Sequence, residues 1–118
     1  MGKIMIVDDE VELLNLYKEM FEIFGHKVIS TVSNGDEAID QYEKLEEKPD
    51  LIILDHRMPV RNGLETAAEI MKMNPDEKII FVSADQSVRK KALELGAIRF
   101  LEKPVDITTL KKMLDEVL

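Results

Sequence analysis

Apolar residues in this chain form two kinds of pattern, short unbroken runs and longer stretches with helical spacing. Four short runs read IMIV, LIIL, IIFV and IRFL, and they are rich in β-branched and aliphatic residues. These runs show no regular alternation of apolar and polar residues. They therefore predict strands buried on both faces, as in a parallel sheet that is covered by helices.

The stretches between these runs predict helices and one further strand. A helix is expected over Val11–Phe24, with Gly25 placed to end it, and Asp106 is a good N-cap for the last helix. The segment Lys27–Val32 predicts an edge strand because it is less apolar. The residues expected to face the core from the five helices are Leu14, Tyr17, Phe21 and Phe24; Ala38, Tyr42 and Leu45; Leu64, Ala67, Ala68 and Met71; Val88, Ala92 and Leu95; and Ile107, Leu110, Leu114 and Val117.

This order of elements is an α/β pattern, (βα)5 with short loops. Because crossovers between parallel strands are right-handed, few arrangements remain, and we expect the flavodoxin-like three-layer sandwich. Its parallel five-stranded sheet has the strand order 2-1-3-4-5, which leaves a crevice between strands one and three at their carboxyl ends. A length of 118 residues fits one domain over residues 1–118.

Composition narrows the functional classes. The net charge of −8 and the absence of a basic stripe argue against direct binding of nucleic acid. No cysteine is present, which excludes disulfides and thiolate metal sites, and no apolar run is long enough to cross a membrane. We therefore expect a cytoplasmic protein without membrane contact, a monomer or a weak dimer.

Each of the four apolar runs ends in a residue that can handle phosphate or a metal ion. The residues are Asp8, Asp9, Asp55, Ser83 and Lys103. Two carboxylates about 4 Å apart repel by roughly 4 kcal/mol at an effective dielectric constant near 20, so three converging acids need a cation. Oxygen ligands favour Mg²⁺ over Ca²⁺, and Mg²⁺ invites phosphate. The lysine and the serine could hold two phosphoryl oxygens, and Asp55 is the natural nucleophile.

These residues resemble the receiver domain of two-component response regulators. The matching features are IVDDE, LIILD, the MP and NG pairs of MPVRNG, the Ser-Ala pair of FVSAD, and FLEKP. A single piece would be a weak signal, but five pieces in order, each at the end of a predicted strand, are specific. The resemblance covers the chain from end to end.

The resemblance implies a phosphoacceptor that is a signalling protein rather than an enzyme, although it assists its own phosphorylation and dephosphorylation. Asp55 would receive a phosphoryl group from a histidine kinase or a histidine phosphotransfer protein. Asp9, Asp55 and the backbone carbonyl of Arg57 would ligate Mg²⁺, with Asp8 acting largely through water. Ser83 and Lys103 would bind the phosphoryl oxygens.

The resemblance also implies a conformational change that responds to phosphorylation. Phe100 takes the position of an aromatic residue that turns inward when the hydroxyl of Ser83 moves, although a strand phenylalanine is usually a core residue. The peptide bond before Pro104 is expected to be cis. Phosphorylation would shift helix four, strand five and helix five, and so change binding to a downstream protein target, in a stand-alone receiver or in the front of a longer regulator.

Three hypotheses concern the surroundings of the pocket. The helix over residues 11–24 carries more apolar residues than one face needs, so Leu13, Leu16 and Met20 are expected either to dock the kinase or phosphotransfer protein or to widen the core contact. Arg57 and Asp85 could pair across the pocket mouth and lengthen the life of the phosphorylated state. His56 is expected to be a loop residue whose side chain points away from Asp55.

Other protein classes remain as alternatives. A haloacid-dehalogenase-like phosphatase also uses Asp and Mg²⁺, but it needs a D-x-D after the first strand, where this chain has adjacent acids. A flavodoxin-like electron carrier needs backbone donors for a flavin phosphate there, and Asp8-Asp9-Glu10 would repel that phosphate. A structural scaffold, or a receiver that no longer accepts phosphate, is the third alternative.

Overall fold

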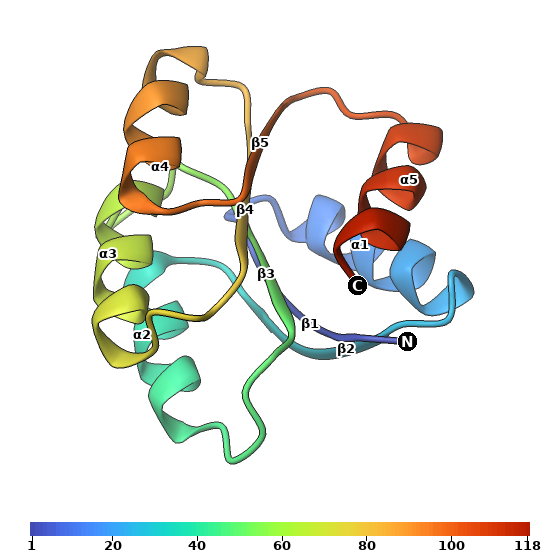
Figure 1. Cartoon of the computed structure of the whole chain (residues 1–118), viewed down its shortest axis with the longest axis horizontal. Helices are drawn as coiled ribbons and strands as arrows, with labels where there is room; N and C mark the ends of the chain where they lie inside the picture. Colours follow the sequence, from blue (N-terminus) through green and yellow to red (C-terminus); the bar gives the residue numbers. More distant parts are fainter.

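A computed structural model describes residues 1–118 and shows a single sheet between two layers of helices (Figure 1). The elements in chain order are β1 (Lys3–Val7), α1 (Val11–Ile23), β2 (Lys27–Val32), α2 (Gly35–Lys44), β3 (Leu51–Leu54), α3 (Gly63–Met73), β4 (Ile79–Ser83), the 3₁₀ turn η1 (Gln86–Val88), α4 (Arg89–Leu95), β5 (Arg99–Glu102) and α5 (Ile107–Val117).

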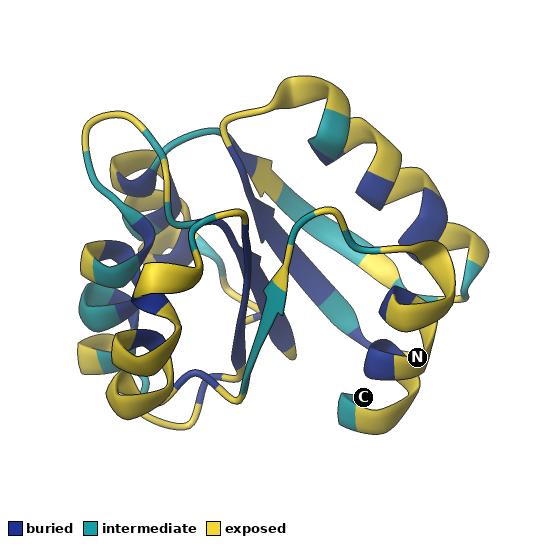
Figure 2. Cartoon of the chain, turned by 90° about the horizontal axis from the view of Figure 1, so that it is seen from above, coloured by how far each residue is buried: buried dark blue, intermediate teal, exposed yellow.

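All neighbouring strands are parallel, and their order is β2-β1-β3-β4-β5. The predicted fold class is therefore confirmed, including the edge position of β2. The inner strands β1, β3 and β4 are almost fully buried, whereas β2 and β5 are partly exposed (Figure 2). Burial on both faces explains why each inner strand is an unbroken apolar run.

The alternating side chains of the inner strands divide the core into two halves. On β1, Ile4 and Ile6 point to the face covered by α1 and α5. Met5 and Val7 point to the opposite face, where α2, α3 and α4 pack. The two helical layers lie on either side of the sheet in Figure 1. The sheet is therefore the centre of a three-layer sandwich.

Helix termini follow the expected chemistry. Gly25 and Gly96, which end α1 and α4, have φ values of 92° and 123°, a region that favours glycine. The Asp106 side chain accepts a hydrogen bond from the Thr109 N–H at the start of α5, as predicted. At the start of α3, the Asn62 and Glu65 side chains and backbones form a reciprocal capping box.

The predicted face of α3 is wrong by one position, and single predicted residues of α4 and α5 are exposed. Leu95 is 36% exposed and Ile107 is 57% exposed, and Met113 is the buried residue that α5 adds to the core. Leu45 lies just beyond α2 and is partly buried. On α3 the buried residues are Gly63, Thr66, Ala67 and Ile70, while Leu64, Ala68 and Met71 are only partly buried.

The shifted face of α3 has a local cause. The Thr66 hydroxyl donates a hydrogen bond to the Asn62 carbonyl one turn earlier, which satisfies the hydroxyl inside the helix. A satisfied hydroxyl can be buried at low cost, so Thr66 is fully buried, with its hydroxyl next to Gly35 of α2, although its residue type indicates a surface position.

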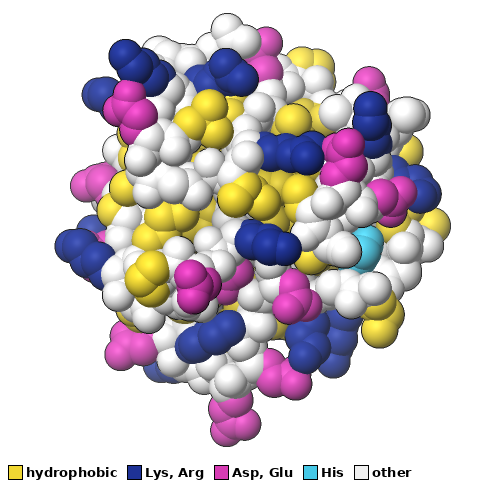
Figure 3. Space-filling view, viewed as in Figure 1, with side chains coloured by type: hydrophobic (Ala, Val, Ile, Leu, Met, Phe, Trp, Pro, Cys, Tyr) yellow, Lys and Arg dark blue, Asp and Glu magenta, His cyan; other side chains and the backbone are white.

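The surface carries charges of both signs. On the face shown in Figure 3, basic and acidic side chains are interspersed around hydrophobic atoms that reach the surface near the centre of the view. No helix is both long enough and apolar enough to pass through a membrane.

Candidate functional site

The residues predicted for the site meet at the carboxyl ends of the strands. Asp8 follows β1, Asp55 follows β3, Ser83 ends β4 and Lys103 follows β5. The strand order changes direction between β1 and β3, and ligands of such sheets bind at that position. The predicted convergence on one edge of the sheet is thus confirmed.

The sheet itself fixes the two inner acids. The Asp8 N–H donates to the Val32 carbonyl at 3.1 Å, and the Asp55 N–H donates to the Val7 carbonyl at 3.0 Å. These bonds continue the sheet by one residue. Asp8 and Asp55 are only 2% and 5% exposed, so their carboxylates are held on a rigid and largely dry support.

Four carboxylates gather at this edge. Ligand oxygens from Asp8, Asp9, Glu10 and Asp55 all lie within 4.8 Å of one another. Asp9 and Glu10 are exposed, whereas the other two acids are buried. Sequence reasoning included the first two acids and Asp55 but gave Glu10 no role. The only available signal was a glutamate at the N-cap of α1, a position where Ser, Thr, Asp or Asn usually caps.

One ammonium group is shared among three of these acids. The Lys103 Nζ lies 2.8 Å from Asp8 Oδ2, 3.1 Å from Asp55 Oδ2 and 3.4 Å from Glu10 Oε1. Burial alone would lower the pKa of Lys103, but the hydrogen bonds and charges of Asp8 and Asp55 outweigh burial and raise the pKa. Lys103 is therefore a permanent cation in the site.

A single lysine does not neutralise the cluster. Burial raises the pKa of Asp8 above its ordinary value, although Lys103 and the Glu10 N–H act in the opposite direction. Four carboxylates against one ammonium leave a formal excess of three negative charges. Carboxylate oxygens are the ligands that a hard divalent cation prefers, so the donor set fits Mg²⁺.

An open cavity of about 280 Å³ lies over the acids. Its lining includes Asp9, Glu10, Asp55, Ser83 and Lys103. The Ser83 hydroxyl oxygen is fully buried and accepts a hydrogen bond from the Asp85 N–H at 3.1 Å, which leaves its own proton available for a ligand. The cavity thus presents acids, a hydroxyl donor and an ammonium donor to one volume.

The loop between β3 and α3 forms one rim of the cavity. The Arg61 N–H donates to the Pro59 carbonyl at 2.8 Å, and Val60 between them has a φ of 71°. This is a γ-turn of the strained, positive-φ kind. Farther along, a Cβ on Gly63 would collide with the Asp55 carbonyl, so the close return of the loop requires glycine.

The predicted ion pair across the pocket mouth is present. Arg57 Nε lies 3.4 Å from Asp85 Oδ2, which joins the β3–α3 loop to the β4–α4 loop. His56 is a loop residue, as predicted, and its Nδ1 accepts a hydrogen bond from the Leu64 N–H rather than facing the cavity. The Lys103–Pro104 peptide bond is cis, as the resemblance implied.

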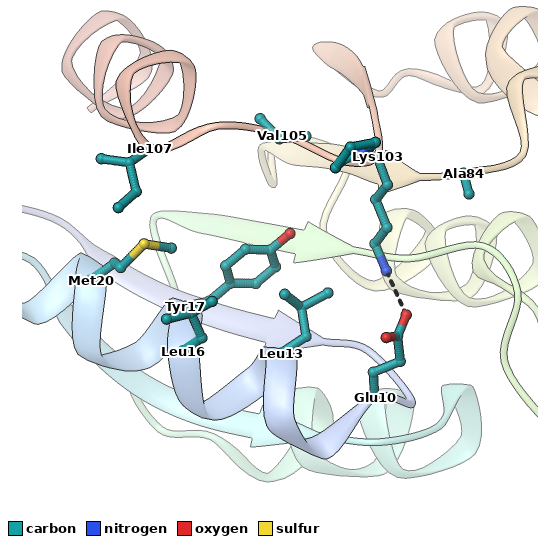
Figure 4. Close-up of a pocket in the computed structure, with 10 residues that line it drawn as sticks. Glu10, Leu13, Leu16, Tyr17, Met20, Ala84, Lys103, Val105 and Ile107 are labelled. Atoms are coloured by element: carbon teal, nitrogen blue, oxygen red, sulfur yellow. Dashed lines mark hydrogen bonds and ion pairs between the residues drawn. The ribbon is translucent and has the colours of Figure 1, made fainter.

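The remaining predicted residues lie outside the acid cavity. Phe100, on β5, is half-buried and stacks on Phe81 with a distance of 6.5 Å between ring centroids. Leu13, Leu16 and Met20 line a groove of about 520 Å³ between α1 and the segment after β5 (Figure 4). Met20 is only 8% exposed and belongs to the core, which fits the alternative of a broader core contact for this residue.

Comparison with known proteins decides the family. The sequence profile of the response regulator receiver domain matches residues 4–115. The chain belongs to the response regulator receiver domain family. The receiver is 36% identical over 120 residues to the chemotaxis protein CheY of Thermotoga maritima, an alignment that spans 99% of this chain and 98% of that protein.

Solved structures give the same result. A chain of the CheX–CheY–BeF₃–Mg²⁺ complex from Borrelia burgdorferi superimposes with a TM-score of 0.91 at 28% identity, covering 98% of this receiver and 87% of that chain. The response regulator TrrA of Thermotoga maritima, in complex with Mg²⁺ and beryllofluoride, superimposes with a TM-score of 0.88 at 34% identity and full coverage of both chains. The receiver is therefore a phosphoacceptor of two-component signalling, and the phosphatase and flavodoxin alternatives are excluded.

Proposed function

We propose that Asp55 is the residue that accepts the phosphoryl group, from a phosphohistidine of a histidine kinase or a phosphotransfer protein, and that residues 1–118 act as one receiver domain. Asp55 Oδ1 accepts a hydrogen bond from the His56 N–H at 2.7 Å, and Oδ2 faces Lys103 at 3.1 Å. A carboxylate oriented at both oxygens attacks phosphorus. The bond from phosphorus to the imidazole nitrogen breaks, and its electron pair stays on that nitrogen.

Mg²⁺ is the cofactor that fits this step. Asp9, Asp55 and the Arg57 carbonyl would hold it, with Asp8 acting largely through water. When bound, the ion supplies positive charge against the negative charge that develops on the phosphoryl oxygens. The excess negative charge of the acid cluster supports this assignment, and two similar structures carry Mg²⁺ with beryllofluoride.

Ser83 and Lys103 would bind the phosphoryl oxygens. The Ser83 hydroxyl lines the cavity with an unused proton, and Lys103 Nζ already lies beside the Asp55 oxygen to which phosphorus would be attached. The backbone of both residues is held by the sheet before the reaction, because Ser83 ends β4 and Lys103 follows β5. Donors that are already in place stabilise a transferring group at little reorganisation cost.

The expected output is a shift of α4, β5 and α5. Movement of the Ser83 hydroxyl toward the phosphoryl group would pull the β4–α4 loop through the hydrogen bond that the Asp85 N–H donates to this hydroxyl. Phe100 stands on the adjacent strand in a half-buried position, from which it can turn inward. The face of α4, β5 and α5 would then bind a downstream protein differently.

The groove beside α1 is the proposed docking site for the kinase or phosphotransfer protein. Leu16 is half-exposed and Leu13 partly buried, and the groove opens next to the acid cavity. Leu16→Ser should slow phosphotransfer from the protein donor and leave phosphorylation by acetyl phosphate unchanged, as followed by mass spectrometry. An unchanged rate from the protein donor removes this docking site.

The Arg57–Asp85 pair is proposed to lengthen the life of the phosphorylated state. The pair lies over the cavity mouth, where an attacking water molecule must pass in line with the bond to Asp55. Arg57→Asn should shorten the lifetime of the phosphorylated receiver, measured by the loss of phosphate after the donor is removed. Equal lifetimes in the two proteins would contradict the role.

One observation carries the proposal: four strand ends bring acids, a hydroxyl and an ammonium into one cavity of about 280 Å³. The test is incubation with acetyl phosphate and Mg²⁺, followed by intact mass measurement. The receiver should gain one phosphoryl group, Asp55→Asn should gain none, and Glu77→Gln, a buried acid elsewhere, should react like the wild type. A wild type that never gains mass contradicts the proposal.

A further inference from the structure

Glu10 occupies an unusual position between two cavities. Three residues line both the acid cavity and the apolar groove beside α1, and they are Glu10, Ala84 and Lys103. In Figure 4 the Glu10 carboxylate turns to the Lys103 ammonium at the end of the groove that adjoins the acid cavity. Glu10 is thus the one carboxylate that faces both volumes.

The backbone of Glu10 is fixed, but its side chain does not serve the helix that begins there. The Glu10 N–H donates to Asp8 Oδ1 at 2.9 Å, and the Glu10 carbonyl accepts from the N–H groups of Leu13 and Leu14. As the N-cap of α1, its side chain makes no capping hydrogen bond. A capping residue normally stabilises a helix, so this position lacks that contribution while its carboxylate faces Lys103.

The carboxylate competes for the ammonium that the phosphoryl group needs. Lys103 Nζ is 3.4 Å from Glu10 Oε1 and 3.1 Å from Asp55 Oδ2. The same negative charge attracts a divalent cation and repels an anion at the acid cavity. Glu10 therefore acts with opposite sign on the two species that the site must hold.

We propose that Glu10 is a positioning residue that sets the balance between cation affinity and phosphoryl affinity, by competing for the Lys103 ammonium and adding charge to the acid cluster. This inference rests on the proposed function, because it concerns the same acid cavity. Removal of the charge takes away one of the acids that share the Lys103 ammonium, which favours the anion, and it weakens the attraction for the metal ion.

The test compares Glu10→Gln with wild type in two titrations at fixed ionic strength. Calorimetry measures Mg²⁺ affinity in the absence of anion, and ¹⁹F NMR measures beryllofluoride affinity at saturating Mg²⁺. Glu10→Gln should bind Mg²⁺ about three- to tenfold more weakly and beryllofluoride about three- to tenfold more tightly. Glu12→Gln is the matched control, since Glu12 is an exposed acid in the first turn of α1 that lines neither cavity.

The possible results distinguish failure of this inference from failure of the proposed function. Opposite shifts in Glu10→Gln, absent from Glu12→Gln, support the inference. Equal affinities in wild type and Glu10→Gln overturn it, and so do two shifts of the same sign, which a merely structural defect would give. A wild type that binds neither Mg²⁺ nor beryllofluoride overturns the proposed function itself.

Discussion

Buried acids occur at two places in this receiver, and their surroundings differ. Asp8 and Asp55 lie at the carboxyl ends of β1 and β3, beside two more acids and an open cavity. Glu77 lies before the amino end of β4, where it is 6% exposed. Its two oxygens accept hydrogen bonds from the Tyr42 hydroxyl at 2.8 Å and from the Lys78 N–H at 3.1 Å.

The Glu77 cluster, which consists of Glu77, Tyr42 and Asn74, finds its hydrogen-bond partners within the protein. Burial is the main cause that raises the pKa of Glu77, and it also raises the pKa of Tyr42 to about 12, so the hydroxyl keeps its proton and donates it. The Asn74 side chain in turn donates to the Tyr42 oxygen at 3.1 Å. These groups cross-link α2, the end of α3 and the start of β4, and no further ligand is required.

The comparison shows what distinguishes a reactive site from a structural one. Both regions bury carboxylates, but only the acid cavity has excess charge and an accessible volume, and the loop that contributes Arg57 to its lining has a strained turn at Val60. A single acid with neutral donors joins secondary-structure elements. Crowded acids with too few cations favour the binding of an ion and of the phosphate that it attracts.

The largest expected effect on stability comes from replacing Lys103. Lys103→Met would leave Asp8 and Asp55 buried without their ammonium, so the free energy of unfolding at neutral pH should fall by about 3 kcal/mol. Added Mg²⁺ should restore part of this loss, because it supplies positive charge to the same oxygens. Urea unfolding with and without Mg²⁺ measures both. A variant as stable as the wild type would show that the lysine is not needed against the acids.

Tyr42→Phe tests the Glu77 cluster. Loss of the hydroxyl leaves Glu77 Oε1 and the Asn74 amide without their buried partner, so unfolding should become easier by about 1 to 2 kcal/mol. The stabilisation by Mg²⁺ should be the same as in wild type. Urea unfolding in parallel with the Lys103 variant gives both values, and a changed response to Mg²⁺ would mean that the two regions are coupled.

The pH dependence of the free energy of unfolding is a further test of the Glu77 cluster. Because the pKa of Glu77 is raised in the folded state from its ordinary value of 4.5, the fold favours the protonated acid. The contribution of Glu77 is therefore greatest below pH 4.5 and is lost as the pH rises through the folded-state pKa. The difference in unfolding free energy between wild type and Glu77→Gln should follow this course. A difference that does not vary with pH would contradict it.

The smallest expected effect concerns the strained turn at Val60 in the β3–α3 loop. Val60 is β-branched, 78% exposed and at a φ of 71°, where glycine is not strained. Val60→Gly should raise the free energy of unfolding by about 0.5 to 1 kcal/mol, since relief of strain exceeds the entropy that glycine adds to the unfolded chain. Thermal unfolding measures the gain. A loss of stability would show that the side chain makes packing contacts that outweigh the strain.

The sequence predicts the strands and the acid cavity well, for a physical reason. A strand that is buried on both faces must be apolar at every position, so IMIV, LIIL and IIFV mark β1, β3 and β4 closely. Parallel strands bring their carboxyl ends to one edge, so the residue after each run is placed by topology alone. Asp8, Asp55 and Ser83 are found in this way.

Helix faces and side-chain directions are less predictable. On α3, helical spacing fits two overlapping rows of residues. Which row faces the core depends on the hydrogen bond from the Thr66 hydroxyl to the Asn62 carbonyl. Ile107 carries an apolar side chain but lies on the rim of the groove, where it stays exposed. The direction of the Glu10 side chain depends on where Lys103 lies, ninety-three residues later in the chain, which no local pattern contains.

The most direct test of the central claim is to locate the phosphoryl group on the chain. After reaction with acetyl phosphate and Mg²⁺, borohydride reduces an aspartyl phosphate to homoserine, which peptide mass spectrometry assigns to one residue. We predict conversion at Asp55 alone, because Asp55 follows the central strand and lines the cavity, whereas Asp8, which is also buried and in contact with Lys103, does not line it. Conversion at Asp8, Asp9 or another acid, with Asp55 unmodified, would contradict the account.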